Sequence, residues 1–212
     1  IAGMIAERYP DHAILGEEGG SRGCAESDWR WVVDPLDGTT NYSQGLPVFA
    51  VSIALQHKGE TVVGVVYAPY LGELFTAVKG GGAHLQYASR EPERIRVGEK
   101  RTLATSVIAT GFPYDKDVNP DNNSDNVARI IPYVRDVRRL GAAAYDISCV
   151  AAGTAGRLLG AGAPRMGHLR RRTDSAGGRR RRLRTPPRPR HLDRSGQCRN
   201  RGGDSEIRQV TD

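Results

Sequence analysis

Two aspartates three residues apart, Asp34 and Asp37, are the residues of this sequence best suited to chemistry. They lie in the string WRWVVDPLDGTTNY, with Pro35 between them and Gly38 directly after. A hard cation such as Mg²⁺ takes oxygen ligands, and proteins usually hold it with one or two carboxylates together with waters and substrate phosphate. The carbonyl of Leu36, in a segment stiffened by proline, offers a further oxygen. The spacing therefore favours a divalent-metal site.

The residues after Asp37 are suited to binding an anion beside that metal site. Gly38 allows backbone to approach a ligand closely. Thr39 opens a Thr-Thr-Asn run that is typical of a helix start, whose unpaired N–H groups attract phosphate. Taken alone, the same residues are also common in turns, because Asp-Pro and Asp-Gly pairs punctuate many loops. A phosphate site and an ordinary turn are both open at this point.

Hydrophobic patterning predicts the elements that position these residues. The apolar run from Trp29 to Val33 is typical of a buried strand, so the two aspartates are expected where a strand ends. Residues 48–97 contain short β-rich segments separated by Gly-containing turns, which predicts an antiparallel meander. An amphipathic segment at 1–9, with Ile1, Met4 and Ile5 on one face, predicts a helix that stops at Pro10.

The later part of the chain alternates between strand and helix patterns. Residues 103–113 predict a strand that enters a loop, and the Asn- and Ser-rich stretch from 122 predicts the start of a helix. The segment RRLGAAAYDISCVAAG predicts a change from strand to helix at Gly141.

The aspartate motif and the segments around it resemble the inositol monophosphatase family of Mg²⁺-dependent phosphomonoesterases. The resemblance runs from Ile1 to about Gly153. It implies an α/β (α+β) fold, a layered α/β/α/β/α sandwich that is incomplete here, with Mg²⁺ as cofactor and a phosphate monoester, first of all inositol monophosphate, as substrate. The matching strings are GEEGG at 16–20, DPLDGTTN at 34–41, LPVFAVSIAL at 46–55, GVVYAPYLGELFTAVKGGGAHL at 64–85, ATGFPYD at 109–115 and RRLGAAAYD at 138–146.

The resemblance also implies roles for single residues. Glu17 and Thr39 would orient the attacking water. Asp146 is not among the implied ligands, and its place one turn into the predicted helix favours a helix-surface or capping group. The implied metal ligands are Glu17, Asp34, the Leu36 carbonyl and Asp37. The implied substrate contacts are Asp37, Gly38, Thr39, Gly141, Ala142 and Ala143.

Two parts of the family's machinery are not expected in this sequence. In the family, an aspartate after a later Trp completes the second metal site, and here the resemblance stops before it. The acidic partner of Thr39 would precede Ile1. A reading-frame shift near Gly153 or Thr154 explains the first loss, because the codons of Met166-Gly167-His168, read one base later, force Trp and permit Asp and Ile. We therefore regard the segment after 153 as an out-of-frame translation.

The basic charge of the chain is confined to its end. The formal net charge is +7, and residues 165–212 contain 15 Arg, no Lys and 5 acidic residues, so the rest of the chain is mildly acidic. This Arg-rich tail has no aromatic residue and few aliphatic ones, which predicts disorder. A basic tail can bind nucleic acid through phosphate contacts. Because a frameshift explains its composition more economically, nucleic-acid binding is not expected.

These patterns divide the chain into three parts. A metal-binding α+β domain with an antiparallel sheet is expected at 1–100, a partial second α/β domain at 101–164 and the disordered tail at 165–212. The three cysteines have no metal-ligand spacing and no apolar stretch is long enough for a membrane, so a cytoplasmic protein is expected. Members of that family are commonly dimers, so a homodimer stays open and is not assumed. Two further functions stay open: a phosphatase of fructose 1,6-bisphosphate or an adenosine bisphosphate, and an inactive binding protein whose tail contacts nucleic acid.

Overall fold

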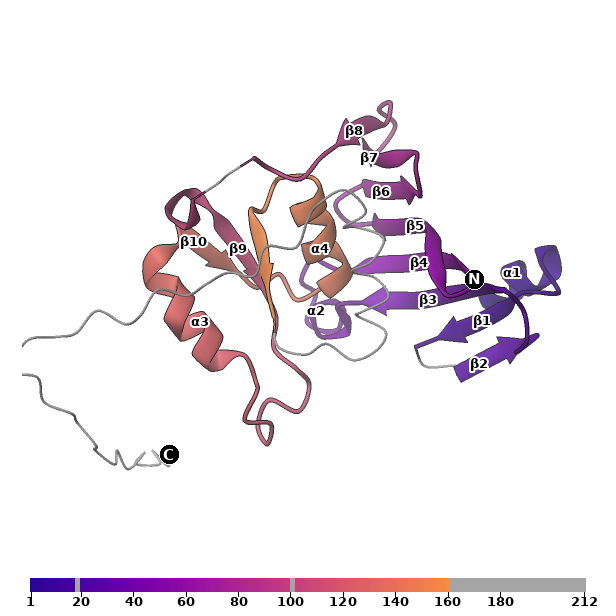
Figure 1. The fold of residues 1–212 in the computed structure, drawn as a ribbon, viewed down its shortest axis with the longest axis horizontal. Helices are drawn as coiled ribbons and strands as arrows, with labels where there is room; N and C mark the ends of the chain where they lie inside the picture. Colours follow the sequence, from indigo (N-terminus) through magenta and orange to yellow (C-terminus); the bar gives the residue numbers. More distant parts are fainter. Residues whose placement is uncertain (18–19, 100–101, 161–212) are drawn as a thin grey trace, which may run out of the picture. The chain divides into compact units, whose positions relative to one another are not determined.

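Two β-sheets with a helix between them form the part of the chain that the computed structural model describes, residues 1–17, 20–99 and 102–160 (Figure 1). All of these residues belong to one unit of the chain, and a second unit, Arg182–Asp212, lies outside them. The predictions made for the tail at 165–212 and for the codons around Met166 also lie outside the described residues. Residues 154–160, regarded from the sequence as out of frame, are described, and Arg157–Leu159 form a strand of the smaller sheet.

The larger sheet has, among the described residues, eight strands in the order β2-β1-β3-β4-β5-β6-β7-β8. β1 runs parallel to β3, and from β3 to β8 each strand pairs antiparallel with the next one in the chain. The meander predicted at 48–97 is therefore confirmed, with φ positive in the turns at Lys58-Gly59 and Gly72. The strands are β1 (Ala13–Gly16), β2 (Gly20–Gly23), β3 (Trp29–Asp37), β4 (Ala50–His57), β5 (Glu60–Ala68), β6 (Glu73–Val78), β7 (Gly82–Tyr87) and β8 (Glu93–Ile95).

Strand β3 extends further than the sequence pattern indicates. The apolar run ends at Val33, but the strand continues through Asp37, and its register against β4 shifts between Asp34 and Asp37. Pro35 lies in this irregular segment and has no N–H to offer β4, so the break in the ladder costs no donor there. Asp34 consequently lies within the sheet and not at the strand's end, which corrects the expectation for this residue, whereas Asp37 is the last residue of β3, as expected.

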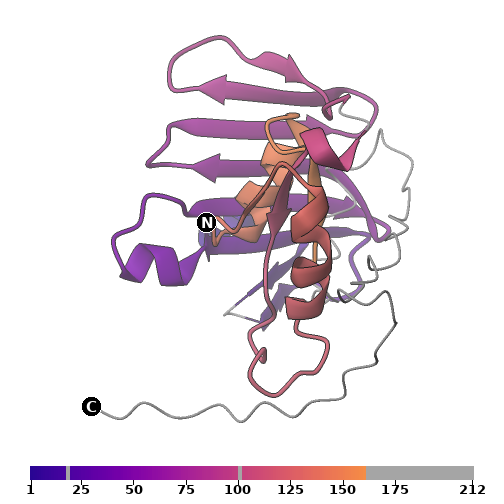
Figure 2. The ribbon, with the colours of Figure 1, turned by 90° about the vertical axis from the view of Figure 1, so that its left-hand side faces the viewer.

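The smaller sheet and its helices follow the predicted alternation. β10 (Asp136–Arg138) and β11 (Arg157–Leu159) run parallel to the central β9 (Val107–Thr110). Figures 1 and 2 show α3 (Ser124–Ile130) on the outer side of this sheet and α4 (Ala143–Ala151) between the two sheets. The strand predicted within 103–113 is confirmed over Val107–Thr110, whereas residues 103–105 form a 3₁₀ segment instead. The strand-to-helix change at Gly141 is confirmed. The 3₁₀ segments are η1 (Leu103–Thr105) and η2 (Ile131–Tyr133).

The main core fills the space between α4 and the two sheets. Several of its members are alanines, and their small side chains let the helix backbone lie close to the strands. Its buried residues are Ala50, Val66, Ala68, Phe75, Leu85, Ala109, Ala142, Ala144, Tyr145, Cys149 and Ala155.

A second, smaller cluster lies beneath α1 (Ala2–Arg8). Ile5 is buried there with Ile14 and Val33. Met4, expected on the same helix face, is 75% exposed, so the predicted apolar face is only partly used. Among the helices that the structure describes, none is long and apolar enough to cross a membrane.

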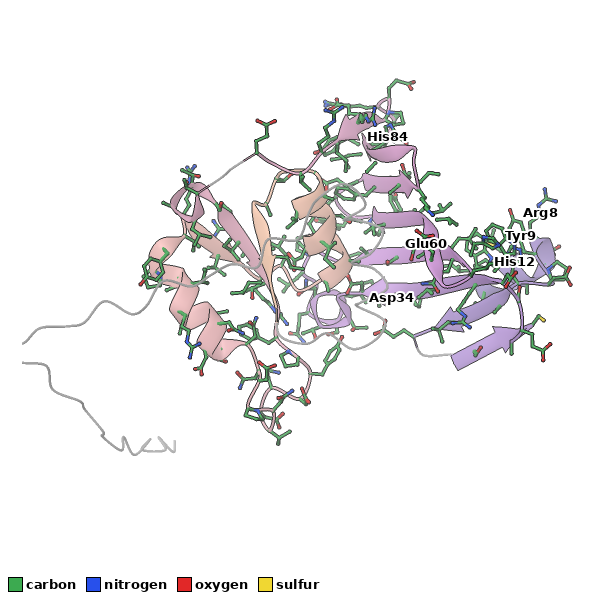
Figure 3. All side chains as sticks on the ribbon, in the orientation of Figure 1. Arg8, Tyr9, His12, Asp34, Glu60 and His84 are labelled. Carbon is green, nitrogen blue, oxygen red and sulfur yellow. The ribbon has the colours of Figure 1, made fainter. Side chains whose placement is uncertain are left out.

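A stack of rings ties α1, β1, β3 and β4 together where β3 begins. The Trp29 ring stacks with His12 and His57, with centroid separations of 5.6 and 4.2 Å, and Tyr9 stacks with His12 at 5.0 Å. The indole N–H of Trp31 donates to Nδ1 of His12 at 3.0 Å. Figure 3 shows Tyr9 and His12 together at the α1 end of the larger sheet. This aromatic stack lies at the opposite end of β3 from the aspartates.

Candidate active site

Asp34 is held within the larger sheet by its own neighbours in the chain. It lies opposite Ser52 of β4 and is 3% exposed. Figure 3 labels Asp34 on the larger sheet. The backbone N–H of Leu36, which is outside the β3–β4 ladder, donates to Asp34 Oδ1 at 3.1 Å. The irregular DPLD segment thus supplies a donor that fixes the orientation of its first carboxylate.

Glu17 is brought beside β3 by the parallel pairing of β1. Gly16 pairs with Val33, and the N–H of Glu17 donates to the Val33 carbonyl at 3.2 Å. The residue that follows each member of this pair carries a carboxylate: Glu17 follows Gly16, and Asp34 follows Val33. A cavity of about 330 Å³ adjoins Glu17 and Pro35, and neither aspartate lines it.

Asp37 joins the aspartate motif to the start of α4. Its Oδ2 accepts the backbone N–H of Ala144 at 2.5 Å, across 107 positions of sequence. Gly38, with φ +88°, precedes α2 (Thr39–Ser43) and packs against the same segment. A Cβ at Gly38 would lie 3.1 Å from Cβ of Ala142 and 3.0 Å from the Val48 carbonyl oxygen. The two motifs that the sequence singled out are therefore in contact.

Asn41 is a site residue that the sequence reasoning treated only as part of a helix start. Its side chain is buried, and Nδ2 donates to the carbonyls of Val48 and Leu140, both at 2.6 Å. Gly141, with φ +90°, leaves room for it, since a Cβ there would lie 2.7 Å from the Asn41 amide. Asn41 thus fixes the α2 segment to the connection that leads into α4. Nothing in the local sequence pattern indicates these long-range bonds.

Asp146 is not the surface or capping group that the sequence suggested. It is 4% exposed, because the first turns of α4 are covered from both sides by the two sheets. Within the described part of the chain, its Oδ1 has no hydrogen-bond partner. Burial, and after it the negative charge of Asp37, raise the pKa of Asp146 to about 7. Asp146 is therefore a second carboxyl group near Asp37, and its surroundings favour the protonated, neutral form.

The predicted substrate contacts differ in their exposure. Thr39 and Ala143 are exposed and Gly141 is half-buried, so backbone at the starts of α2 and α4 can be reached from solvent. Ala142 is fully buried in the core, packed against Gly38. Its side chain shapes the backbone around the site, and a role for it in contacting substrate stays a prediction.

The carboxylates fit Mg²⁺ in chemical type but not as a large cluster. Among the described residues, no three His, Cys, Asp or Glu side chains are gathered so that they could hold a metal ion by themselves. Mg²⁺ needs fewer protein ligands, since one or two carboxylates with water and phosphate suffice. Asp34 and Asp37 are hard oxygen donors of the required kind, and their joint binding of Mg²⁺ stays a prediction. The wider ligand set with Glu17 and the Leu36 carbonyl stays a prediction.

Several known proteins are similar to this chain in sequence. The chain is 47% identical to the Nus factor SuhB of Pasteurella multocida over 153 residues, which are 72% of this chain and 55% of that protein. It is 43% identical to the Nus factor SuhB of Escherichia coli over the same shares. The chain therefore spans about half the length of these relatives.

Solved structures show the same fold. The inositol monophosphatase from Anabaena (Nostoc) superimposes with a TM-score of 0.75 at 37% identity, over 84% of this chain and 69% of that one. The extragenic suppressor protein suhB from Bartonella henselae superimposes with a TM-score of 0.64 at 40% identity, over 73% and 58%. The profile of the inositol monophosphatase family matches residues 1–166. This chain belongs to the inositol monophosphatase family.

Proposed function

We propose that this chain acts in the Mg²⁺-dependent hydrolysis of a phosphate monoester, with inositol monophosphate as the foremost substrate. The observation that carries the proposal is the hydrogen bond from Ala144 N–H to Asp37 Oδ2. It joins the acidic motif suited to a cation to the small-residue segment suited to a phosphate ester. Family membership supports the reaction class.

Each group in the proposed site has its own task. Asp34 and Asp37 would hold Mg²⁺, with Glu17 and the Leu36 carbonyl as further oxygen ligands. The bound ion would supply positive charge that polarises the phosphate and acidifies a water molecule. Thr39 and Glu17 would orient that water.

The phosphate would lie against the backbone of two segments. Gly38 and Thr39 stand at the start of α2, and Gly141, Ala142 and Ala143 lead into α4. Backbone N–H groups in such segments donate to phosphate oxygens without the rotamer cost of a long side chain. Asp37 belongs to both halves of the site, because it is the second aspartate of the acidic motif and also accepts the hydrogen bond from Ala144 of α4.

Phosphate release from inositol 1-phosphate, with Mg²⁺ titrated and EDTA as control, tests the proposal. Release that depends on Mg²⁺ is the expected result. Folded protein that releases no phosphate at any Mg²⁺ concentration would refute it. Fructose 1,6-bisphosphate and adenosine bisphosphate belong in the same assay, since faster release from either would favour those phosphatase activities instead. Sedimentation of the same sample tests the homodimer.

A second candidate is action as a Nus factor, because relatives 43–47% identical to this chain carry that name. Expression of the chain in Escherichia coli cells that lack their own SuhB tests it, with Asp37→Asn in parallel. Growth restored by both forms would favour a binding role without catalysis. Growth restored by the unaltered chain alone would favour catalysis.

A further inference from the structure

A row of residues crosses four neighbouring strands of the larger sheet, β3 to β6, near one end of those strands. It runs beneath the start of α4. Asp37 pairs with Ala50, Val51 pairs with Tyr67, and Ala68 pairs with Glu73. The row therefore reads Asp37, Ala50, Ala68, Glu73 across four adjacent strands. Neighbouring strands lie about 4.8 Å apart, so the two carboxylates are separated by roughly 14 Å. Both alanines between them are fully buried, which lets the helix lie directly over the row.

Consecutive residues of α4 bond to the two ends of this row. Ala144 donates its backbone N–H to Asp37 Oδ2 at 2.5 Å, and Tyr145 donates its hydroxyl to Glu73 Oε2 at 2.8 Å. The Tyr145 ring is 8% exposed and meets Phe75 edge-on, with ring centroids 6.0 Å apart. The start of α4 is thus held to β3 at one point and to β6 at another.

The Tyr145 bond is well suited to fixing a position. Burial, and after it the bond to Glu73, raise the pKa of the Tyr145 hydroxyl, so the phenol keeps the proton that it donates. Its ring is enclosed by the core and has little rotational freedom. A bond between a rigid buried ring and a strand residue fixes the rotation of the helix, which sets the direction of the neighbouring Ala144 N–H.

We propose that Glu73 and Tyr145 are positioning residues for Asp37, acting through the Ala144 N–H. Among the described residues, the bond from Ala144 to Asp37 is another hydrogen bond between the first turn of α4 and the larger sheet, so without the bond from Tyr145 to Glu73 this turn is held less firmly. The Ala144 N–H then moves relative to Asp37, and this hydrogen bond to the carboxylate is weakened. Glu73 and Tyr145 have no part in the chemistry itself.

Hydrogen exchange at the Ala144 amide tests this directly. The N–H of the second residue of a helix has no acceptor inside the helix, so its protection reports on the bond to Asp37. In Tyr145→Phe, which removes only the hydroxyl, exchange at Ala144 should become roughly threefold to tenfold faster, as expected for the loss of one net hydrogen bond. Amide exchange followed by NMR measures this on the metal-free protein.

Three controls separate positioning from general loosening. Tyr87→Phe removes another phenol opposite Glu73 in the sheet, one that makes no hydrogen bond within the described part of the chain, and should leave Ala144 unchanged. Glu73→Gln keeps an acceptor and should preserve most of the protection, whereas Glu73→Ala should match Tyr145→Phe. The Ala152 amide, bonded to Ser148 O at 2.9 Å at the other end of α4, should not change. Equal acceleration at Ala144 and Ala152, or none at Ala144, would overturn the proposal.

A second measurement links the contact to the metal, and this part rests on the proposed function. Mn²⁺ binding followed by water proton relaxation should weaken roughly threefold to tenfold in Tyr145→Phe and stay unchanged in Tyr87→Phe. Equal Mn²⁺ affinity in the unaltered chain and Tyr145→Phe would overturn the link to Asp37. If the unaltered chain binds no Mn²⁺, the proposed function fails, and exchange at Ala144 still decides the positioning role.

Discussion

Asp37 combines a negative charge with a structural hydrogen bond, and one substitution separates them. In Asp37→Asn an amide oxygen can still accept the Ala144 N–H, while the charge that favours Mg²⁺ is lost. Because changing a residue that only supports a metal ligand costs 10- to 100-fold, loss of a ligand should lower phosphate release at least about 100-fold. Phosphate release measures activity, and circular dichroism should show an unchanged fold. The exposed Asp125→Asn is the matched control, and equal activity in both variants would contradict the role of Asp37.

Asp146 should make the stability of the chain depend on pH. Its pKa is raised from 3.8 to about 7, so between these values the folded chain keeps a proton that the unfolded chain has released. Stability therefore falls as pH rises from about 4 to about 7 and stays low above that range. Asp146→Asn imitates the neutral form and should raise the free energy of unfolding at pH 8 by about 2 kcal/mol, with little gain at pH 4. Urea unfolding in EDTA checks this, and an equal gain at both pH values would refute it.

At the scale of elements, Gly141 decides how closely the α2 segment and the lead into α4 approach each other. Gly141→Ala combines an unfavourable positive φ with a clash against the Asn41 amide. Gly45→Ala is the control, because Gly45 also has positive φ but open space where a Cβ would lie. The control should cost about 1–2 kcal/mol of unfolding free energy, and Gly141→Ala about 1–3 kcal/mol more. Chemical denaturation of both variants measures the difference, and equal costs would show that the approach of Asn41 is unimportant.

The elements that sequence reasoning found are those whose signal is local. The strands between Val48 and Val97 alternate in hydrophobicity and end in turn residues, so their pattern alone predicts the meander. The extension of β3 through Asp37 was missed, since Pro35 and the polar aspartates resemble a turn. The buried state of Asp146 was missed for another reason. Helical periodicity shows which residues share a face, but not that sheets cover a helix on both sides.

The same holds for the site: motifs made of neighbouring residues were predictable, and contacts between residues far apart in the sequence were not. The acidic motif and the segment at Gly141 were each recognised from their own residues, and the family resemblance set them in one site. The bonds that join them, from Asn41 to Leu140 and from Ala144 to Asp37, span 99 and 107 positions. Such contacts follow from the packing of α4 on the sheet, which single-sequence patterns do not encode.

For the whole molecule, Mg²⁺ binding should appear as increased stability. A ligand that binds only the folded state adds about 2.7 kcal/mol at a concentration 100 times its Kd. Mg²⁺ should therefore raise the melting temperature, and EDTA should reverse the rise. Differential scanning calorimetry checks this, with Asp34→Asn and an NaCl solution of equal ionic strength as controls. A rise of the same size in NaCl would show that ionic strength and not a site is responsible.

The aromatic stack at the beginning of β3 has an optical consequence. Trp29 and Trp31 are the only two tryptophans of the chain, and both contact the imidazole of His12, one by stacking and one by a hydrogen bond. Intrinsic fluorescence therefore reports on the end of β3 remote from Asp37. Emission from this chain is a probe of its α1 end. A change in emission on adding substrate would mean that binding near Asp37 alters the structure around Trp29 and Trp31, at the other end of β3.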